Sequence, residues 1–345
     1  MRITILWSSL ASYSVAFFKD LSLQGCRIQL IFQPIETDAP YQPFDLSFCQ
    51  MVLEDSIDVK LNLELLVRDF NPACILMSSW CFPHFMRLTK KLRKNSVYVV
   101  SAMDNQWRGT FRQYFGVVSS SILLKPSIDN FLVSGDRQAF FANKLGYKDV
   151  MYGYGAAETS RFFCDIPIWK RSKNFLFVGR LVPVKGIKEL VQAYIAYRER
   201  VKDPWGLKVV GAGPLADLFS DVPGIDLLGF VQPTNLPDLM HEARCFVLPS
   251  LWEQWGVVLH EATAGGLPVI ATYPCGAITM FARDGINGYI VPPQSPNLTK
   301  AMVRISTASQ EVLERMSATS STLAELWNPT MLAKYFIDKV NYFIG

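Results

Sequence analysis

Two glutamates, Glu253 and Glu261, lie eight residues apart in an otherwise apolar or small stretch, "PSLWEQWGVVLHEATAGGLPVIAT" (249–272). The pattern predicts a buried strand over 245–250, a loop over 251–255 and a helix from about 256 to 264 that ends at Gly265-Gly266. Helical side chains tilt toward the helix N-terminus, so Glu261 should point back at the loop. The alternative is a solvent-exposed helix residue and a simple loop charge.

The chemistry of such an arrangement suits a nucleotide. A carboxylate that is partly withdrawn from water needs hydrogen-bond donors, and the two hydroxyls of a ribose would supply them. The free backbone N–H groups around residues 254–257 would suit a phosphate.

A second group of polar residues lies in "FLFVGRLVPVKGIKEL" (175–190). Arg180 follows the end of a predicted buried strand, and Lys185 stands at the start of a helix, next to Gly186. Two cations and a helix N-terminus form a site for a diphosphate. The alternative is a solvated loop with ordinary surface cations.

The segment "LKVVGAGPLA" (207–216) matches the dinucleotide pattern G-x-G-x-x-A only weakly. Pro214 is unusual at the opening of a phosphate-binding helix, and the strand is the second of its half of the chain, whereas the fingerprint normally follows the first. We therefore do not expect a dinucleotide site here.

The elements that position these residues alternate between short apolar runs and helical patterns. Strands are predicted at 2–6, 27–32, 73–77, 97–102, 174–179, 207–211, 225–230, 245–250 and 268–272, with helices such as 187–201 between them. This alternation predicts an α/β fold with two Rossmann-like parallel-sheet domains facing across a cleft. We expect an N-terminal domain over 1–160, a C-terminal domain over 161–327 and a last helix, 328–345, that crosses back to the N-terminal domain.

The composition excludes several classes of protein. A net charge of +4 over 345 residues is too small to indicate nucleic-acid binding. The seven cysteines form no C-x-x-C pair and no zinc-type cluster, which is typical of a reducing compartment. The first residues, "MRITILWSSLASYSVAFF", are expected to be a strand, a loop and a helix and not a leader peptide, and no run is long enough for a membrane span.

The C-terminal half resembles the retaining GT-B glycosyltransferases of family 4. The similarity is carried by "FVGRLVPVKGIKELVQAY", "VVGAGPL", "LLGFVQPTNLPDLM", the segment 249–272, "CGAITMFARDGINGYIVPP" and "LWNPTMLAKYF", about half the chain. The resemblance implies a retaining hexosyltransferase that uses a nucleotide-diphosphate sugar, with UDP expected before GDP. No cofactor and no obligatory metal are expected, because no D-x-D sequence follows a strand.

The resemblance also implies roles for individual residues. Arg180 and Lys185 would hold the diphosphate, Glu253 the transferred sugar and Glu261 the ribose, so that Arg180, Lys185 and Glu253 form the catalytic set. The remaining implied donor-binding positions are Gly179, Gly213, Phe230, Val231, Gln254, Trp255, Gly256 and Val257.

The N-terminal half departs from the family pattern. The loop after the first strand, "SSLASYS", has no glycine, the usual histidine is replaced by Met103-Asp104, and Thr279 stands where an acid is usual. The acceptor, which is expected to be a saccharide, a lipid-linked compound or another small molecule, is therefore not identified. We expect the acceptor side to be lined by Ser8, Ser9, His84, Asp104, Asn105 and Trp107, which follow strand ends.

A basic helical segment, "MRLTKKLRKN", contains Arg87, Lys90, Lys91, Arg93 and Lys94. It could contact anionic lipid, or it could be the solvated face of an ordinary helix. We expect a cytoplasmic enzyme of polysaccharide or glycoconjugate biosynthesis, and the first of these two interpretations would add peripheral contact at the inner face of a membrane. The alternative activities are those of a GT-B-fold sugar-nucleotide epimerase or phosphorylase, and a non-catalytic nucleotide-sugar-binding protein is a third hypothesis.

Overall fold

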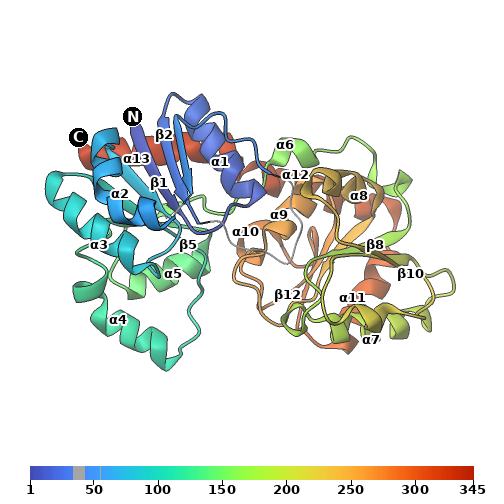
Figure 1. The fold of residues 1–345 in the computed structure, drawn as a ribbon. Coiled ribbons are helices and arrows are strands. Elements are labelled where there is room, and N and C mark those ends of the chain that lie inside the picture. The colour runs from blue at the N-terminus through green and yellow to red at the C-terminus, as the bar shows by residue number, and fades with distance from the viewer. Residues whose placement is uncertain (34–42, 55) are drawn as a thin grey trace. The chain divides into compact units, whose positions relative to one another are not determined.

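The structure, a computed structural model, describes residues 1–33, 43–54 and 56–345. It consists of two compact units (Figure 1). Unit 1 comprises Met1–Ala156 and Pro329–Gly345, and unit 2 comprises Ala157–Asn328. The division lies at 156/157, whereas the sequence placed the boundary at 160/161.

Unit 1 contains a seven-stranded parallel sheet in the order β3-β2-β1-β4-β5-β6-β7. Its strands are β1 (Arg2–Trp7), β2 (Arg27–Phe32), β3 (Met51–Glu54), β4 (Cys74–Met77), β5 (Tyr98–Met103), β6 (Asn130–Val133) and β7 (Met151–Tyr152). Its helices are α1 (Ser12–Leu23), α2 (Ile57–Phe70), α3 (Pro83–Leu92), α4 (Phe111–Leu123), α5 (Asp136–Lys144) and α13 (Pro329–Ile344).

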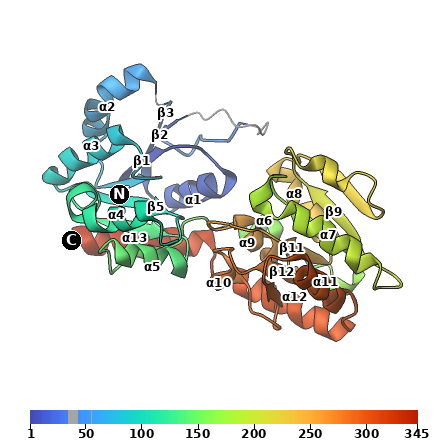
Figure 2. The same cartoon turned by 90° about the horizontal axis from the view of Figure 1, so that it is seen from below.

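Apolar side chains from both faces of this sheet form the core of unit 1. On one face, Leu6 and Phe131 pack with Leu63 of α2 and Phe85 of α3. On the other face α1 packs against α13, which runs beside it although it is the last helix of the chain (Figure 2). The parallel sheet is thus covered on both faces, as such sheets require.

Unit 2 contains a six-stranded parallel sheet in the order β10-β9-β8-β11-β12-β13. Its strands are β8 (Asn174–Val178), β9 (Gly206–Val210), β10 (Ile225–Gly229), β11 (Cys245–Leu248), β12 (Val269–Thr272) and β13 (Gly288–Val291). Its helices are α6 (Thr159–Phe162), α7 (Ile187–Arg198), α8 (Leu236–Glu242), α9 (Val257–Ala264), α10 (Ile278–Phe281), α11 (Ser295–Ser306) and α12 (Gln310–Glu325).

Both sheets confirm the predicted α/β class with two Rossmann-like domains. All nine predicted strands are present to within a few residues, and α9 begins one residue after the predicted start. The predictions did not include β3, β6, β7 and β13, although β4, β11 and β12, which also have four residues, were predicted.

Candidate active site

The topology of unit 2 brings two loops together. The chain forms β8, β9 and β10 in one direction and then returns to place β11 on the other side of β8. The loops that follow β8 and β11 therefore leave the sheet at the point where the strand order reverses, which is where ligands bind to such sheets. The first loop carries Arg180 and Lys185, and the second carries Glu253.

Lys185 and Glu253 form an ion pair between these two loops. The Lys185 Nζ donates to Glu253 Oε2, and the two side chains are only 17% and 14% exposed. The hydroxyl of Ser250 also donates to Glu253 Oε2, at 3.4 Å. The resemblance implies that Lys185 binds the diphosphate and Glu253 the sugar of one ligand. In the structure the two side chains contact each other.

The backbones of the two loops are also joined directly. The N–H of Leu251 donates to the carbonyl of Val184 at 2.9 Å. Gly186 has a φ of 70°, and a Cβ at this position would lie 2.1 Å from the carbonyl oxygen of Pro249. Only glycine permits this approach, and it fixes Lys185 opposite Glu253.

Arg180 lies at the carboxyl end of β8 on the same loop as Lys185. Its side chain is exposed, and among the residues that the structure describes it has no hydrogen bond or ion pair. A cation that is not committed to a protein acid remains available to an anionic ligand.

Glu261 lies in the second turn of α9 and is partly buried. No described residue donates a hydrogen bond to its carboxylate. Burial raises the pKa of Glu261 to about 7, and the nearby cation of Arg161 opposes this rise. The expectation that it faces a ribose is not tested by the structure, but a carboxylate without donors is what such a role requires.

Arg161 of α6 was not singled out from the sequence. Its guanidinium donates to Glu158 at 3.3 Å and to the carbonyl of Pro233 at 3.2 Å, and its charge acts on Glu261. No local pattern marks Arg161. Only Glu158 is near it in the sequence, whereas Pro233 and Glu261 lie at least seventy residues away along the chain.

The start of α9 offers unpaired backbone donors. Gly256 precedes the helix with a φ of 95°, and the N–H groups of Val257 and Val258 have no partner among the described residues. The Trp255 ring is buried against Phe281, with the ring centroids 5.8 Å apart, so only the backbone of Trp255 can contribute to a site. Gln254 is partly exposed beside it.

The glycines after β8 and β9 hold the neighbouring loops close together. A Cβ on Gly213 would lie 2.6 Å from the carbonyl oxygen of Leu181, and a Cβ on Gly211 would lie 1.9 Å from that of Gly179. The 3-10 helix Ala216–Phe219 follows, not an α-helix that could receive a diphosphate. The dinucleotide pattern is thus explained by loop packing.

The predicted donor-binding residues Phe230 and Val231 follow β10, and both are partly exposed.

His260, the neighbour of Glu261, has a structural role. It is fully buried and stacks on Phe281, its Nδ1 accepts from the N–H of Ala157, and its Nε2 contacts the carbonyl of Ala324 at 3.1 Å. Burial lowers the pKa of His260 to about 3. The ring therefore stays neutral and ties α9 to α12.

In unit 1 the strand order reverses between β1 and β4, and the predicted acceptor residues lie near this edge. The N–H of Ser8 donates to Ser78 Oγ at 3.0 Å, joining the two loops there. Ser9 follows on the same loop and is partly exposed. His84 lies in the first turn of α3, with its ring 4.3 Å from that of Phe85.

The other three predicted acceptor residues follow β5. The carbonyl of Asp104 accepts from Gln138, and Asn105 lines a hollow of about 520 Å³ beside α4. The Trp107 ring packs against Tyr114 and Phe141, with ring centroids 4.9 and 5.5 Å away, so part of its surface is used in contacts within unit 1.

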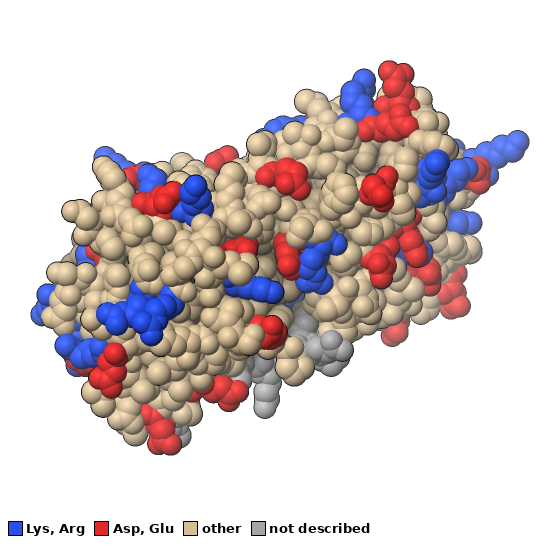
Figure 3. All heavy atoms as spheres, turned by 90° about the horizontal axis from the view of Figure 1, so that it is seen from above, with Lys and Arg blue, Asp and Glu red and all other residues tan. Residues whose placement is uncertain are grey.

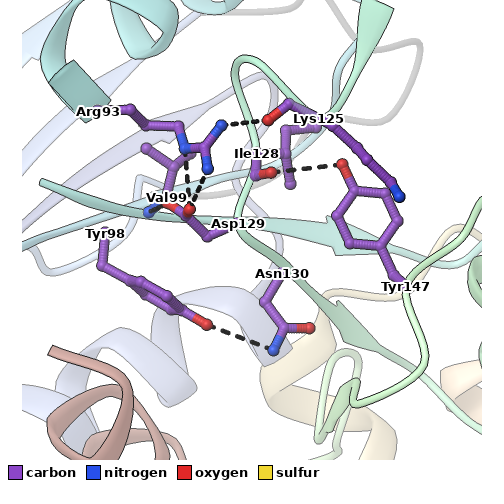
Figure 4. Close-up of polar contacts among 8 residues, drawn as sticks. All are labelled: Arg93, Tyr98, Val99, Lys125, Ile128, Asp129, Asn130 and Tyr147. Atoms are coloured by element: carbon purple, nitrogen blue, oxygen red, sulfur yellow. Dashed lines mark hydrogen bonds and ion pairs between the residues drawn. The ribbon is translucent and has the colours of Figure 1, made fainter. Parts of the chain in front are cut away.

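The basic segment 86–95 is partly committed to internal contacts. Lys91 pairs with Glu64 at 2.7 Å. Arg93 contacts Asp129 and the carbonyl of Lys125, and Asp129 also accepts from the N–H of Val99 at 2.8 Å (Figure 4). Arg87, Lys90 and Lys94 are exposed.

Three properties of the described residues concern membranes, metal ions and surface charge. None of their helices is both long and apolar enough to cross a membrane. No three of their histidine, cysteine, aspartate or glutamate side chains gather as metal ligands. On the face shown in Figure 3, cationic and anionic side chains are interspersed.

Part of the second unit is similar to known proteins. Residues 172–307 match the family model of the glycosyl transferases group 1. An uncharacterized glycosyltransferase of Methanocaldococcus jannaschii is 32% identical over 147 residues, 41% of this chain and 37% of the relative. The D-inositol 3-phosphate glycosyltransferase of Streptomyces griseus is 30% identical over 166 residues, 44% of this chain and 35% of the relative. The match thus spans little more than a third of the length of these relatives.

The similarity of fold extends over both units. Anabaena HepE, solved with UDP and glucose, superposes with a TM-score of 0.75 at 14% identity, over 99% of this chain and 100% of that one. A sucrose-phosphate synthase of Thermosynechococcus elongatus superposes with a TM-score of 0.76 at 16% identity, over 99% of both chains. The chain therefore has the two-domain GT-B fold, and within its second unit residues 172–307 are similar to the glycosyl transferases group 1 family.

Proposed function

We propose that this protein is a retaining glycosyltransferase that moves a hexose from a nucleotide-diphosphate sugar to a saccharide, a lipid-linked compound or another small molecule. UDP-sugar is the first choice of donor and GDP-sugar the second. The observation that carries the proposal is the placement of Lys185 against Glu253 at the strand reversal of unit 2. On the adjoining helix, the carboxylate of Glu261 receives no hydrogen bond from any residue that the structure describes.

The donor would replace the contact between Lys185 and Glu253. Its diphosphate would take Lys185 and Arg180 and the free N–H groups of Val257 and Val258. Glu253, released from Lys185, would accept hydrogen bonds from the hexose hydroxyls, and Glu261 would accept two from the ribose diol. The ion pair thus serves to keep both side chains in place before the donor arrives.

In the reaction the bond between the anomeric carbon and the diphosphate oxygen breaks, and its electron pair leaves with the phosphate. Arg180 and Lys185 stabilise the charge that develops there. The acceptor oxygen attacks the same face of the oxocarbenium-like sugar, and its proton passes to the departing phosphate oxygen. Holding both substrates in the reactive orientation lowers the entropic part of the activation barrier.

Three further points concern the need for a metal ion, the cellular compartment and the donor. We propose that turnover needs no metal ion, so activity should persist in excess EDTA. All seven cysteines are free thiols, which fits a reducing compartment such as the cytoplasm. The solved neighbours with UDP and with UDP-glucose support the choice of donor.

The test is a panel of UDP- and GDP-sugars, first by thermal shift and then by nucleotide release with candidate acceptors. A donor at 100 times its dissociation constant should add about 2.7 kcal/mol of stability. Release that requires an acceptor identifies a transferase, whereas conversion of the sugar without an acceptor would identify an epimerase, and release that requires inorganic phosphate a phosphorylase.

The matched variants are Lys185→Ala and Lys188→Ala, which remove neighbouring lysines of the same segment. The first should lose about 10²–10³-fold in turnover, because its cation meets the charge that forms on the leaving group. The second side chain is exposed on α7 and should leave turnover unchanged. Similar turnover in both variants would refute the assignment of Lys185.

A further inference from the structure

Exposed apolar side chains follow one face of α4. Phe111, Tyr114, Phe115, Val118 and Ile122 are 95%, 57%, 69%, 81% and 74% exposed. Their spacing places all five within about 100° of the helix circumference. We call this row the α4 stripe.

The opposite face of α4 anchors the helix to unit 1. Val117 packs against the hydrophobic core, and Ser120 Oγ donates to the carbonyl of Leu145 at 2.9 Å. The stripe therefore cannot turn inward. Single exposed apolar residues are ordinary, but a continuous row of five large ones indicates a contact surface.

Positive charge is concentrated around the stripe. Residues 80–129 contain eight lysines and arginines against two aspartates, a net charge of +6, although the whole chain has only +4. One of these cations, Lys91, is paired with Glu64 of α2. Arg108 and Arg112 stand at the start of α4 and Lys125 just beyond its end, and all three are exposed.

Helix α3, which carries further cations in its sequence, belongs to the same unit as α4 (Figure 1). The segment after α4 lies against α3, because Ser127 Oγ donates to the carbonyl of Met86 and Arg93 contacts that of Lys125. Lys90 and Lys94 of this region are exposed.

We propose that α4 lies flat on an anionic membrane surface, with the α4 stripe at the boundary between headgroups and acyl chains and the surrounding cations on the lipid phosphates. An apolar stripe flanked by lysines and arginines is the pattern of an interfacial helix. Thirteen residues form a helix of only about 20 Å, too short to span a bilayer.

A second copy of the chain is the less favourable occupant. A symmetric dimer formed through the stripe would bring the same surface from both copies together. Two regions of net charge +6 would then face each other, which opposes association, whereas an anionic membrane neutralises them.

The placement has a consequence that rests on the proposed function, although the docking itself does not. The loop between β5 and α4 carries the candidate acceptor residues Asp104, Asn105 and Trp107. A docked α4 would hold this loop at the interface, where the headgroup of a lipid-borne acceptor lies.

The test uses the full chain and sedimentation with vesicles, either of phosphatidylcholine alone or mixed with phosphatidylglycerol. The stripe variant Phe111→Ser/Phe115→Ser/Val118→Ser should bind the anionic vesicles at least about tenfold more weakly. Its matched control is Leu61→Ser/Leu65→Ser on α2, whose side chains are 78% and 59% exposed, and it should bind like the wild type.

The charge variant Lys90→Gln/Arg112→Gln should lose more than about fivefold on anionic vesicles and nothing on neutral ones. Its control, Lys188→Gln/Lys300→Gln in unit 2, should lose nothing. Hydrogen exchange on the wild type gives a readout without mutation, because residues 111–123 should gain protection on anionic vesicles.

Several results would overturn the proposal: no binding of the wild type, equal binding to neutral and anionic vesicles, or equal losses in the variants and their controls. A dimer in sedimentation velocity that the stripe variant dissociates would instead identify the surface as a subunit interface. Neither result depends on finding the donor, so docking and the proposed function fail separately.

Discussion

Glu261 and Glu253 are both carboxylates on one loop–helix connection, but their surroundings differ. Glu253 already has a lysine and a serine as partners, whereas Glu261 has no donor among the described residues. If Glu261 binds the ribose, Glu261→Gln should weaken nucleotide diphosphate and full donor alike, by about 1.5–3 kcal/mol. Glu253→Gln should weaken only the donor.

Calorimetry of both variants with both ligands separates these effects. The wild type with nucleotide diphosphate sets the reference, and the difference between diphosphate and donor isolates the contribution of the hexose. If each variant lost the same affinity for both ligands, the two acids would be wrongly assigned.

The raised pKa of Glu261, about 7, predicts a dependence on pH. The ribose hydroxyls donate to the ionised carboxylate, so nucleotide diphosphate should bind several-fold more tightly at pH 8 than at pH 6. The ligand phosphate also ionises near pH 6, but equally for every variant. The ratio of wild-type to Glu261→Gln affinity should therefore rise with pH, and a constant ratio would contradict the role of this carboxylate.

The same pKa makes the ligand-free protein less stable as the pH rises, whereas ligand binding becomes tighter. The folded state keeps a proton on Glu261 that the unfolded chain releases near pH 4.5, so the free energy of unfolding falls between about pH 4.5 and 7. The loss should be about 1–3 kcal/mol. Denaturant unfolding at pH 5 and pH 8 should show that Glu261→Gln is less sensitive to pH than the wild type.

At the scale of elements, the turn before α7 decides whether the two loops of the site can meet. The Cβ of Gly186→Ala would enter the carbonyl of Pro249 at a backbone conformation that alanine avoids. We expect a loss of at least about 1–3 kcal/mol in the free energy of unfolding. Turnover should fall as well, because Lys185 moves away from Glu253.

Gly116 in α4 is the matched control, because a Cβ there meets nothing within 4 Å. Gly116→Ala should stabilise the protein by about 0.5–1 kcal/mol, since alanine favours the helix. Denaturant unfolding measures both changes, and a neutral Gly186→Ala would show that the close approach of the loops is not required.

At the scale of the whole molecule, the last helix belongs to the first unit. Phe336 of α13 is fully buried and lies 5.9 Å from the ring of Phe17 in α1. Phe336→Ala should cost about 3–5 kcal/mol. Hydrogen exchange should rise in α1 and β5 while the strands of unit 2 keep their protection.

Tyr342 lies in the same helix and is 76% exposed, so Tyr342→Ala should change hydrogen exchange in neither unit. If Phe336→Ala raised exchange equally in both units, the chain would unfold as one body and the division into two units would have no energetic meaning.

The sequence alone determined the fold class and the positions of the two loops that carry Arg180, Lys185 and Glu253. The strands at 174–179 and 245–250 and the helix after Gly256 were readable because each combines a local apolar run with glycine or proline punctuation. The types of Arg180, Lys185, Glu253 and Glu261 then predicted a ligand with phosphate and hydroxyl groups.

Only the tertiary structure decided which of these groups contact each other. Lys185 and Glu253 are 68 residues apart, and no local period encodes a contact made by the reversal of strand order. The surroundings of Glu261, in which no described residue donates to its carboxylate, likewise depend on what packs nearby. The same holds for the contacts of Arg93 and the exposure of the α4 stripe. A sequence pattern states which face of a helix is apolar, whereas the presence or absence of a covering partner is a property of the folded chain.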